Sequence, residues 1–426
     1  MTKKSLIIYY LVLFVLLVFT WANMTTLPII IRLAYLSLLF IPCFKHSYLL
    51  APTLILFLTT ALLSFGYTFL PTEVYYYIAI AAVIAIVSVT VHKKFIPTSY
   101  GVLFVLLLLI TIVNAVTGTS VEKVTFSLLL FLLLFLSVQP KDIRNVLELV
   151  PLCFIIYTLT CSILILAHQK ELVMSYAGDL ERVLSGSINY TCTTIGIGSV
   201  VGLIGSFDSA NKGIKRIISI ATVVLSIIVL LLEASRGAIL AVAAADVIVI
   251  LSQKVKTRYK VFGIILLAGL VYVLYQQDYF DLLIYRIQAD DGTGANRTDI
   301  WESKLRYFWD LQNPFSILFG IGFNRTWNLG GGSFDYIGCH NDFIAFLVEY
   351  GIVGIGFFFY LLLYPFIKSS RSIRRSILPY IVFIVVDCLT LEPISMGYLP
   401  IYFLLFYVYL MKSKDVMDLT SSRYQQ

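Results

Sequence analysis

The sequence predicts an all-α fold, a polytopic bundle of about 12–14 transmembrane helices with one large loop on its outer side. Of the 426 residues, 59% are hydrophobic and only 13% are charged, whereas charged residues make up about 25% of a soluble domain. The apolar residues form long uninterrupted runs, unlike the alternating strands of a membrane β-barrel. Because a helix satisfies its own backbone hydrogen bonds in lipid, these runs indicate a helical bundle.

Apolar runs of roughly 20 residues mark the candidate spans. The first run follows Lys3 and Lys4 and lacks a small-residue cleavage site, so we expect it to be retained as the first helix. The whole of 1–426 is expected to form a single integral membrane domain. The predicted spans are 6–22, 27–43, 48–69, 74–91, 97–116, 121–137, 146–166, 188–206, 214–233, 236–252, 259–277, 340–367, 377–393 and 396–411.

The basic residues orient these spans. With an inner amino terminus, most of the 31 lysines and arginines fall in short inner loops, including the clusters at 254–260 and 368–375. This asymmetry follows the positive-inside rule. It leaves two long outer segments, the smaller at 167–187 and the larger at 278–339. The net charge of +7 is therefore a topology signal, and no nucleic-acid partner is expected.

The larger outer segment contains a predicted helix. Asn296 has a favourable N-cap side chain, and Asn313-Pro314 is expected to end the helix. At 100° per residue, apolar residues and two cations share one stripe, and the acidic residues face away. This pattern is typical of an interfacial helix that binds a lipid-linked phosphate, or whose long cationic side chains only snorkel. The stripe consists of Arg297, Ile300, Trp301, Lys304, Leu305 and Phe308. The residues that face away are Asp299, Glu302, Arg306 and Asp310.

The stretch GCHNDFIAFLVEYGIVG, residues 338–354, places His340 and Asn341 at the start of a predicted span, with Glu349 about 13 Å further along it. Histidine takes up a proton near neutral pH. Arginine donates paired hydrogen bonds to phosphate oxygens, and Arg182, Arg236 and Arg297 lie on the same predicted face. The combination predicts attack by a hydroxyl on a phosphate-activated carbon. The alternatives are a capping histidine and interfacial arginines.

Several other chemistries lack their motifs. The sequence contains no HExxH, Walker A, dinucleotide-binding or GxSxG pattern. Its six cysteines form no CxxC pair. We therefore expect neither a metal ion nor a cofactor.

Three short segments, in this order, resemble the O-antigen polymerase and O-antigen ligase superfamily of bacterial envelope glycosyltransferases. They are SRGA at 235–238, Arg297 and Trp301 followed by NPFSILFGIGFN at 313–324, and HNDFIAFLVEYGIVG at 340–354. The resemblance covers 235–354 closely and the rest of the multi-helix layout loosely.

The resemblance implies transfer of a glycan from a polyprenyl diphosphate carrier at the periplasmic face of the bacterial inner membrane, without a metal. His340 would match the family's histidine, which activates the acceptor hydroxyl. Arg236 and Arg297 would match the arginines that engage the diphosphate, and Arg182 would match an arginine of the earlier outer loop. Lys304 is expected to join the diphosphate site, with Asn341, Trp301 and Glu349 in supporting roles.

The residues do not separate a polymerase, which we expect, from a ligase that transfers the polymer to lipid A core. A chain-length-regulating membrane protein is an expected partner of a polymerase. A polyprenol-glycan flippase is the alternative from another class, because transporters carry ionisable residues along a mid-membrane path. The candidates for such a path are Asp246 and Asp387, and Asp246 could instead pair with a polar group on a neighbouring helix.

Overall fold

The computed structural model describes eleven helices and strands and the turns beside them. The described residues are 143–167, 173–174, 181–182, 188–208, 211–252, 297–310, 313–322, 326 and 338–390, with scattered positions in 8–53 and 258–276. The spans predicted before residue 143, at 259–277 and at 396–411 lie largely or wholly outside the described residues.

The described part is helical apart from one antiparallel pair, β1 and β2, whose register pairs Val173 with Arg182. This confirms the helical class, and the spans predicted from 146 to 252 coincide with helices to within a few residues. In chain order the elements are η1 (Ser47–Leu49), α7 (Ile143–Ala167), β1 (Val173–Met174), β2 (Glu181–Arg182), α8 (Ile188–Phe207), α9 (Ile214–Leu232), α10 (Arg236–Ser252), α13 (Arg297–Asp310), α14 (Pro314–Phe319), α15 (Asp342–Lys368) and α16 (Arg371–Thr390).

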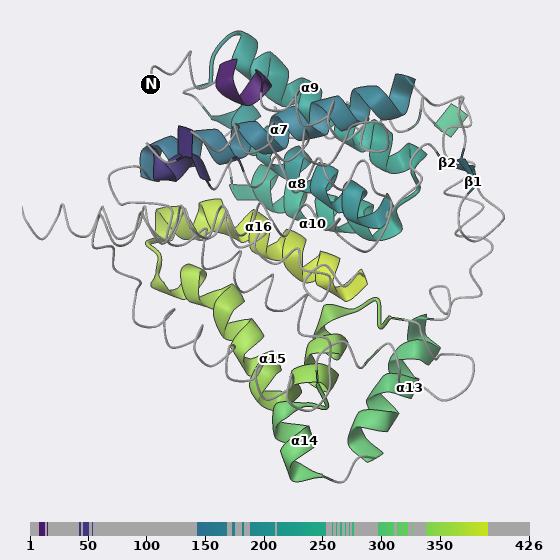
Figure 1. The fold of residues 1–426 in the computed structure, drawn as a ribbon. Coiled ribbons are helices and arrows are strands. Elements are labelled where there is room, and N and C mark those ends of the chain that lie inside the picture. The colour runs from purple at the N-terminus through teal and green to yellow at the C-terminus, as the bar shows by residue number, and fades with distance from the viewer. Residues whose placement is uncertain are drawn as a thin grey trace, which may run out of the picture.

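The helices form two groups. Figure 1 shows α7, α8, α9 and α10 lying together as a bundle, with α16 along its side. Helices α13, α14 and α15 form a second group, which we call the outer group. The two groups meet where α15 packs against α16.

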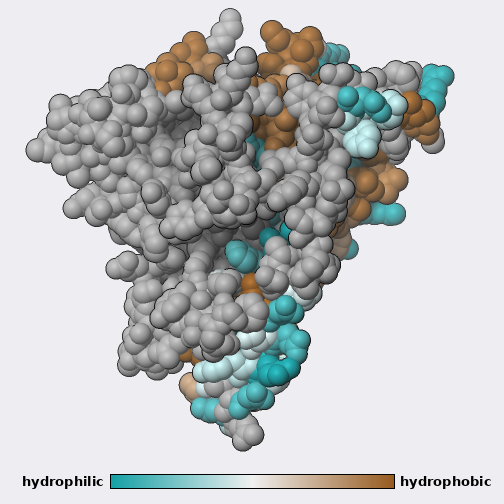
Figure 2. Space-filling view, turned by 90° about the vertical axis from the view of Figure 1, so that its right-hand side faces the viewer, coloured by the Kyte–Doolittle hydropathy of each residue, from teal (hydrophilic) through white to brown (hydrophobic). Residues whose placement is uncertain are grey.

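Helix α9 has the surface of a lipid-facing helix. Its buried side carries Ser219, Thr222 and Ser226, whereas Ile214 and Ile217 on the opposite side are 73% and 65% exposed. This distribution is unfavourable in water and favourable in lipid, where small residues mediate helix contacts. Figure 2 shows hydrophobic residues over the upper part of the molecule, with hydrophilic ones among them at the upper right, and mostly hydrophilic residues over the lower end. By length and composition alone, two described segments could cross a membrane, Ile214–Leu232 and Asp342–Tyr360, and the second of them contains the break at Gly351.

Glycines bring α8 close to its neighbours. A Cβ atom at Gly198 would lie 1.8 Å from the Oγ1 atom of Thr158 on α7. A Cβ atom at Gly202, one turn later, would lie 2.9 Å from the carbonyl oxygen of Ser219 on α9. The spacing of four residues is that of the GxxxG motif, which lets membrane helices approach at backbone distance.

Helix α15 is not the continuous span predicted for 340–367. Gly351 has φ 70° and ψ −169°, which interrupts the helix. The ring of Phe343 lies 5.4 Å from that of Phe358 and 5.5 Å from that of Phe359, although residues 15 apart in one helix are separated by about 22 Å. The first arm (342–350) and the second arm (352–368) therefore fold back on each other, as Figure 1 shows. The prediction failed because the apolar run continues on both sides of Gly351.

We expect Gly202→Ala to lower the unfolding temperature measured in detergent, because the added Cβ collides with backbone and overpacking costs about 1–3 kcal/mol. Gly205→Ala is the matched control on the same helix. Its Cβ would meet the side-chain Oγ of Ser219 at 2.8 Å, which can rotate away. Equal losses in the two variants would contradict close α8–α9 packing.

Candidate functional site

Helix α13 lies on the first arm of α15 through the predicted stripe. Ile300, Lys304 and Phe308 are buried, and Phe308 forms an apolar cluster with Val348 of the first arm. The residues predicted to face away, Asp299, Glu302, Arg306 and Asp310, are exposed. The stripe prediction is confirmed, and the helix begins at Arg297; the predicted cap, Asn296, lies outside the described residues.

Asn313 and Pro314 begin a helix, although the sequence indicated only the end of one. The Asn313 side chain accepts a hydrogen bond from the backbone N–H of Phe315 at 3.0 Å. Pro314 occupies the first position of α14, where its fixed φ is favourable and its missing N–H has no cost. The Asn-Pro pair therefore reverses the chain from α13 into α14.

The segment after α14 docks on the break in α15, and we call this contact the elbow (320–322 and 348–351). The N–H of Ile321 donates to the carbonyl of Val348 at 3.0 Å, and that of Gly322 donates to the carbonyl of Glu349 at 3.1 Å. These carbonyls have no helical donor because α15 breaks at Gly351.

Glycine is required on both sides of the elbow. Gly320 and Gly351 have positive φ values of 82° and 70°. A Cβ atom would lie 2.1 Å from the Glu349 carbonyl oxygen at Gly320, and 2.4 Å from the Leu318 backbone at Gly351. Both the left-handed conformation and the space exclude other residues.

Glu349 ties the large outer segment to the elbow. Its carboxylate accepts hydrogen bonds from the hydroxyl and the backbone N–H of Thr326, at 2.6 Å and 3.4 Å. Glu349 is only 2% exposed and Thr326 only 1%. The geometry gives Glu349 a structural role, and the supporting role predicted for it at the site stays a prediction.

His340 lies before α15 rather than in its first turn, which corrects the predicted helix start. Asn341 is the N-cap, and its side chain accepts from the N–H groups of Phe343 at 3.0 Å and Ile344 at 3.2 Å. His340 itself has φ 49°, a left-handed conformation uncommon for residues other than glycine.

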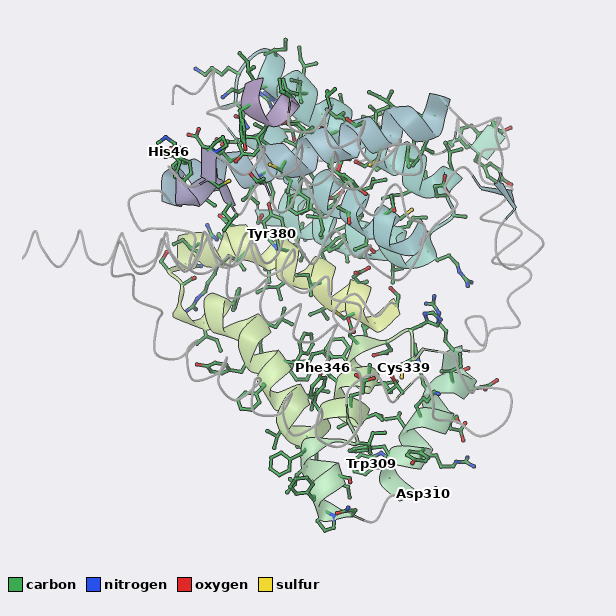
Figure 3. All side chains as sticks on the ribbon, viewed as in Figure 1. His46, Trp309, Asp310, Cys339, Phe346 and Tyr380 are labelled. Atoms are coloured by element: carbon green, nitrogen blue, oxygen red, sulfur yellow. The ribbon has the colours of Figure 1, made fainter. Side chains whose placement is uncertain are left out.

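The backbone is held on both sides of His340. The indole Nε1–H of Trp301 donates to the carbonyl of Cys339 at 2.7 Å, and the side chain of Asn341 donates to the carbonyl of Leu389 on α16 at 3.4 Å. Figure 3 shows Cys339 between α13 and α15. His340 is thus fixed between α13 and the end of α16.

Arg236 and Arg297 each begin a helix, and both helices are tied to the elements around His340. Arg236 opens α10, and the following Gly237 packs on Thr390, whose Oγ1 would lie 2.4 Å from a Cβ atom there. Thr390 follows Leu389, the hydrogen-bond partner of Asn341. Arg297 lies one turn before Trp301 on α13. The starts of α10, α13 and α15 therefore meet at the end of α16.

Burial, and secondly the positive charge of Arg297, lower the pKa of His340 from 6.5 to about 4. Both effects disfavour the imidazolium. The imidazole is therefore neutral at pH 7 and free to accept a proton.

Lys304 and Arg182, the other two residues predicted to bind the diphosphate, are less closely tied to the segment around His340. Lys304 is fully buried on the stripe of α13 that packs on α15. Arg182 ends β2, where its backbone pairs with Val173; its side chain lies outside the described ones. Their predicted contacts with a diphosphate stay predictions.

Sequence reasoning did not single out Asp342, and it named Asp387 only as a candidate for a transport path. Asp342 is fully buried and electrostatically coupled to the buried Cys388. Asp387 is also fully buried, and its carboxylate accepts a hydrogen bond from Thr193 at 2.9 Å, which links α8 to α16. The position of Asp342 just after the capping Asn341 was the available signal.

Within the part of the chain that the structure describes, the Oδ1 atom of Asp246 is buried without a hydrogen-bond partner; the predicted pairing of Asp246 with a polar group on a neighbouring helix stays a prediction. Among the described residues, no group of three or more His, Cys, Asp or Glu side chains could hold a metal ion.

Residues 221–359 match the model of a family described as O-Antigen ligase. The match covers about a third of the chain and includes Arg236, Arg297 and His340. It confirms the resemblance inferred from the three short segments. No curated protein matches the chain.

We expect Gly351→Ala to lower the unfolding temperature in detergent strongly, because its Cβ meets the Leu318 backbone and alanine is strained at positive φ. Gly356→Ala, five residues later in the same helix, meets nothing within 4 Å. It should leave the unfolding temperature unchanged or raise it slightly, since alanine favours helix. A stable Gly351→Ala protein would show that the elbow is dispensable.

Proposed function

We propose that this protein is a membrane glycosyltransferase that polymerises polyprenyl-diphosphate-linked oligosaccharide repeat units at the outer face of the bacterial inner membrane, in a multi-pass bundle. The observation that carries the proposal is a partly buried His340 beside Arg297, fixed between α13 and α16, where burial and the arginine charge lower the pKa of the imidazole. The family match supports an enzyme that acts on O-antigen-type glycans.

In the proposed reaction, the neutral imidazole of His340 takes the proton of an acceptor hydroxyl. The hydroxyl oxygen forms a bond to the anomeric carbon of the donor glycan as the bond from that carbon to the diphosphate oxygen breaks. The departing polyprenyl diphosphate gains negative charge, which Arg236 and Arg297 offset from fixed positions. Imidazolium then returns its proton to water. Attack opposite the leaving group inverts the anomeric configuration.

Through Arg297, binding of the donor would also change the basicity of His340. Without an anion its charge lowers the pKa of His340. A bound diphosphate would neutralise that charge, so the pKa would rise and the imidazole would become a stronger base. The histidine is then strongest as a base when a donor is in place.

The remaining predicted residues support this arrangement. Trp301 and Asn341 hold the backbone around His340, and Glu349 holds the elbow beneath it. Lys304 adds a buried amine to α13, and Arg182 would reach the diphosphate from the earlier outer segment. A chain-length-regulating membrane protein is the proposed partner.

Ligation to lipid A core is the second candidate, because the matched family is described as O-Antigen ligase. It uses the same donor and the same base, and differs only in the acceptor. Flippase activity is less supported, since Asp387 is bonded to Thr193 rather than open to a path.

The central test is the surface glycan of a strain carrying His340→Ala, compared on a gel with wild type and with a clean deletion. His46→Ala is the matched control, because His46 lies beside Tyr48 far along the chain from the site. With membrane levels equal, single repeat units on the acceptor identify a polymerase. Long polymer retained on the polyprenyl carrier identifies a ligase, and normal surface polymer would refute a catalytic His340.

The pH dependence offers a separate check in purified protein. A base must be neutral, so kcat/KM for the donor should stay level above about pH 5 and fall only as pH drops through about 4. In Arg297→Gln the overall rate should drop, but the acid limb should move to higher pH because a cation that lowers the His340 pKa is gone. An acid limb unmoved by Arg297→Gln would contradict the pairing.

A further inference from the structure

The outward stripe of α13 combines an ion pair with an exposed aromatic ring. Glu302, Arg306 and Trp309 are spaced at i, i+4 and i+7, which places them on one face. The Glu302 and Arg306 side chains form a salt bridge while 67% and 70% exposed, and Trp309 is 54% exposed. A large exposed indole among charged groups marks a contact surface.

The indole of Trp309 is held in place from behind. Its ring packs edge to face on Phe308, with centroids 5.0 Å apart and planes at 70°. Phe308 is fully buried against the first arm of α15. Figure 3 shows Trp309 and Asp310 at the end of α13. The exposed indole face is therefore preorganised, which limits the entropy lost on binding a ligand.

The charges beside Trp309 select the kind of ligand. Acyl chains on this stripe would desolvate Glu302 and Arg306, which is unfavourable. A sugar ring satisfies both features, because its C–H groups lie against the electron-rich face of an indole and its hydroxyls hydrogen-bond to carboxylate and guanidinium groups.

The stripe also lies at a suitable distance from the site. Arg297 begins α13 beside His340, and Trp309 is twelve residues further, about 18 Å along the helix. An oligosaccharide of a few sugars, with its reacting end at His340, covers that length.

We propose that Trp309, with Glu302 and Arg306, forms a binding subsite for a sugar of the repeat unit remote from the bond being made. This rests on the proposed function, since the ligand is the glycan of the donor or acceptor. The subsite would contribute to selecting repeat units of the correct composition before the reaction at His340.

The alternative is that the Trp309 indole lies in the membrane interface, where tryptophan is also enriched. Phe315 and Leu318 of α14 are 57% and 44% exposed, so this end of the outer group has apolar side chains of its own. The charged neighbours of Trp309 favour the glycan, and the experiment separates the two.

The experiment measures kcat and KM for carrier-linked repeat unit with the purified full-length protein and its Trp309→Ala and Trp309→Phe variants. Trp309→Ala should raise KM about three- to tenfold, the effect of losing one stacked ring, and leave kcat within about twofold. Trp309→Phe should recover part of the loss. Tyr307→Ala is the matched control, because Tyr307 is 42% exposed on a different side of α13 and should leave KM unchanged.

Direct binding uses the free repeat-unit oligosaccharide as probe. It should change the tryptophan fluorescence of wild type clearly more than that of Trp309→Phe, which keeps Trp301 beside His340. An unchanged KM in Trp309→Ala overturns the subsite, and quenching of Trp309 by brominated lipids would then assign it to the interface. If His340→Ala abolishes transfer while Trp309→Ala behaves as wild type, the subsite alone fails; if His340→Ala is active, the proposed function fails.

Discussion

The donation of two backbone N–H groups to a broken helix determines the geometry of the outer group. When α15 breaks at Gly351, the carbonyls of Val348 and Glu349 lose their helical donors. Ile321 and Gly322 replace those donors. An unpaired buried carbonyl is costly, particularly where water is scarce. The break can therefore exist only while the segment after α14 is docked, and the fold-back of α15 depends on it.

The placement of His340 follows from the same constraint. Because the first arm folds back, its amino-terminal end points to the end of α16, where Asn341 donates to Leu389. His340 itself adopts a left-handed backbone that costs free energy. The hydrogen bond from Trp301 to Cys339 and the cap at Asn341 fix the residues on either side. The strained conformation is thus maintained by three separate elements, which is typical of functional sites.

Sequence patterns identified what depends on local periodicity. Apolar runs predicted the bounds of α7 to α10. The 100° repeat predicted the buried face of α13, because an amphipathic helix carries its apolar residues on the face that packs against the protein. The break at Gly351 was not predictable in this way. Glycine is common in membrane helices, and the apolar run continues on both sides of Gly351. The interruption is stabilised by Ile321 and Gly322, some thirty residues earlier, and no local pattern reports such a contact.

The candidate site lies at the junction of two groups, and this division has a chemical consequence. His340 and Arg297 belong to the outer group, whereas Arg236 belongs to the bundle through α10 and α16. In the proposed reaction, charge develops on the diphosphate while a proton moves to the histidine. An anion held between Arg236 and Arg297 would attract the two groups toward each other and remove the repulsion that Arg297 exerts on a protonated His340. Donor binding would therefore bring the two halves of the site together and strengthen the base in a single step.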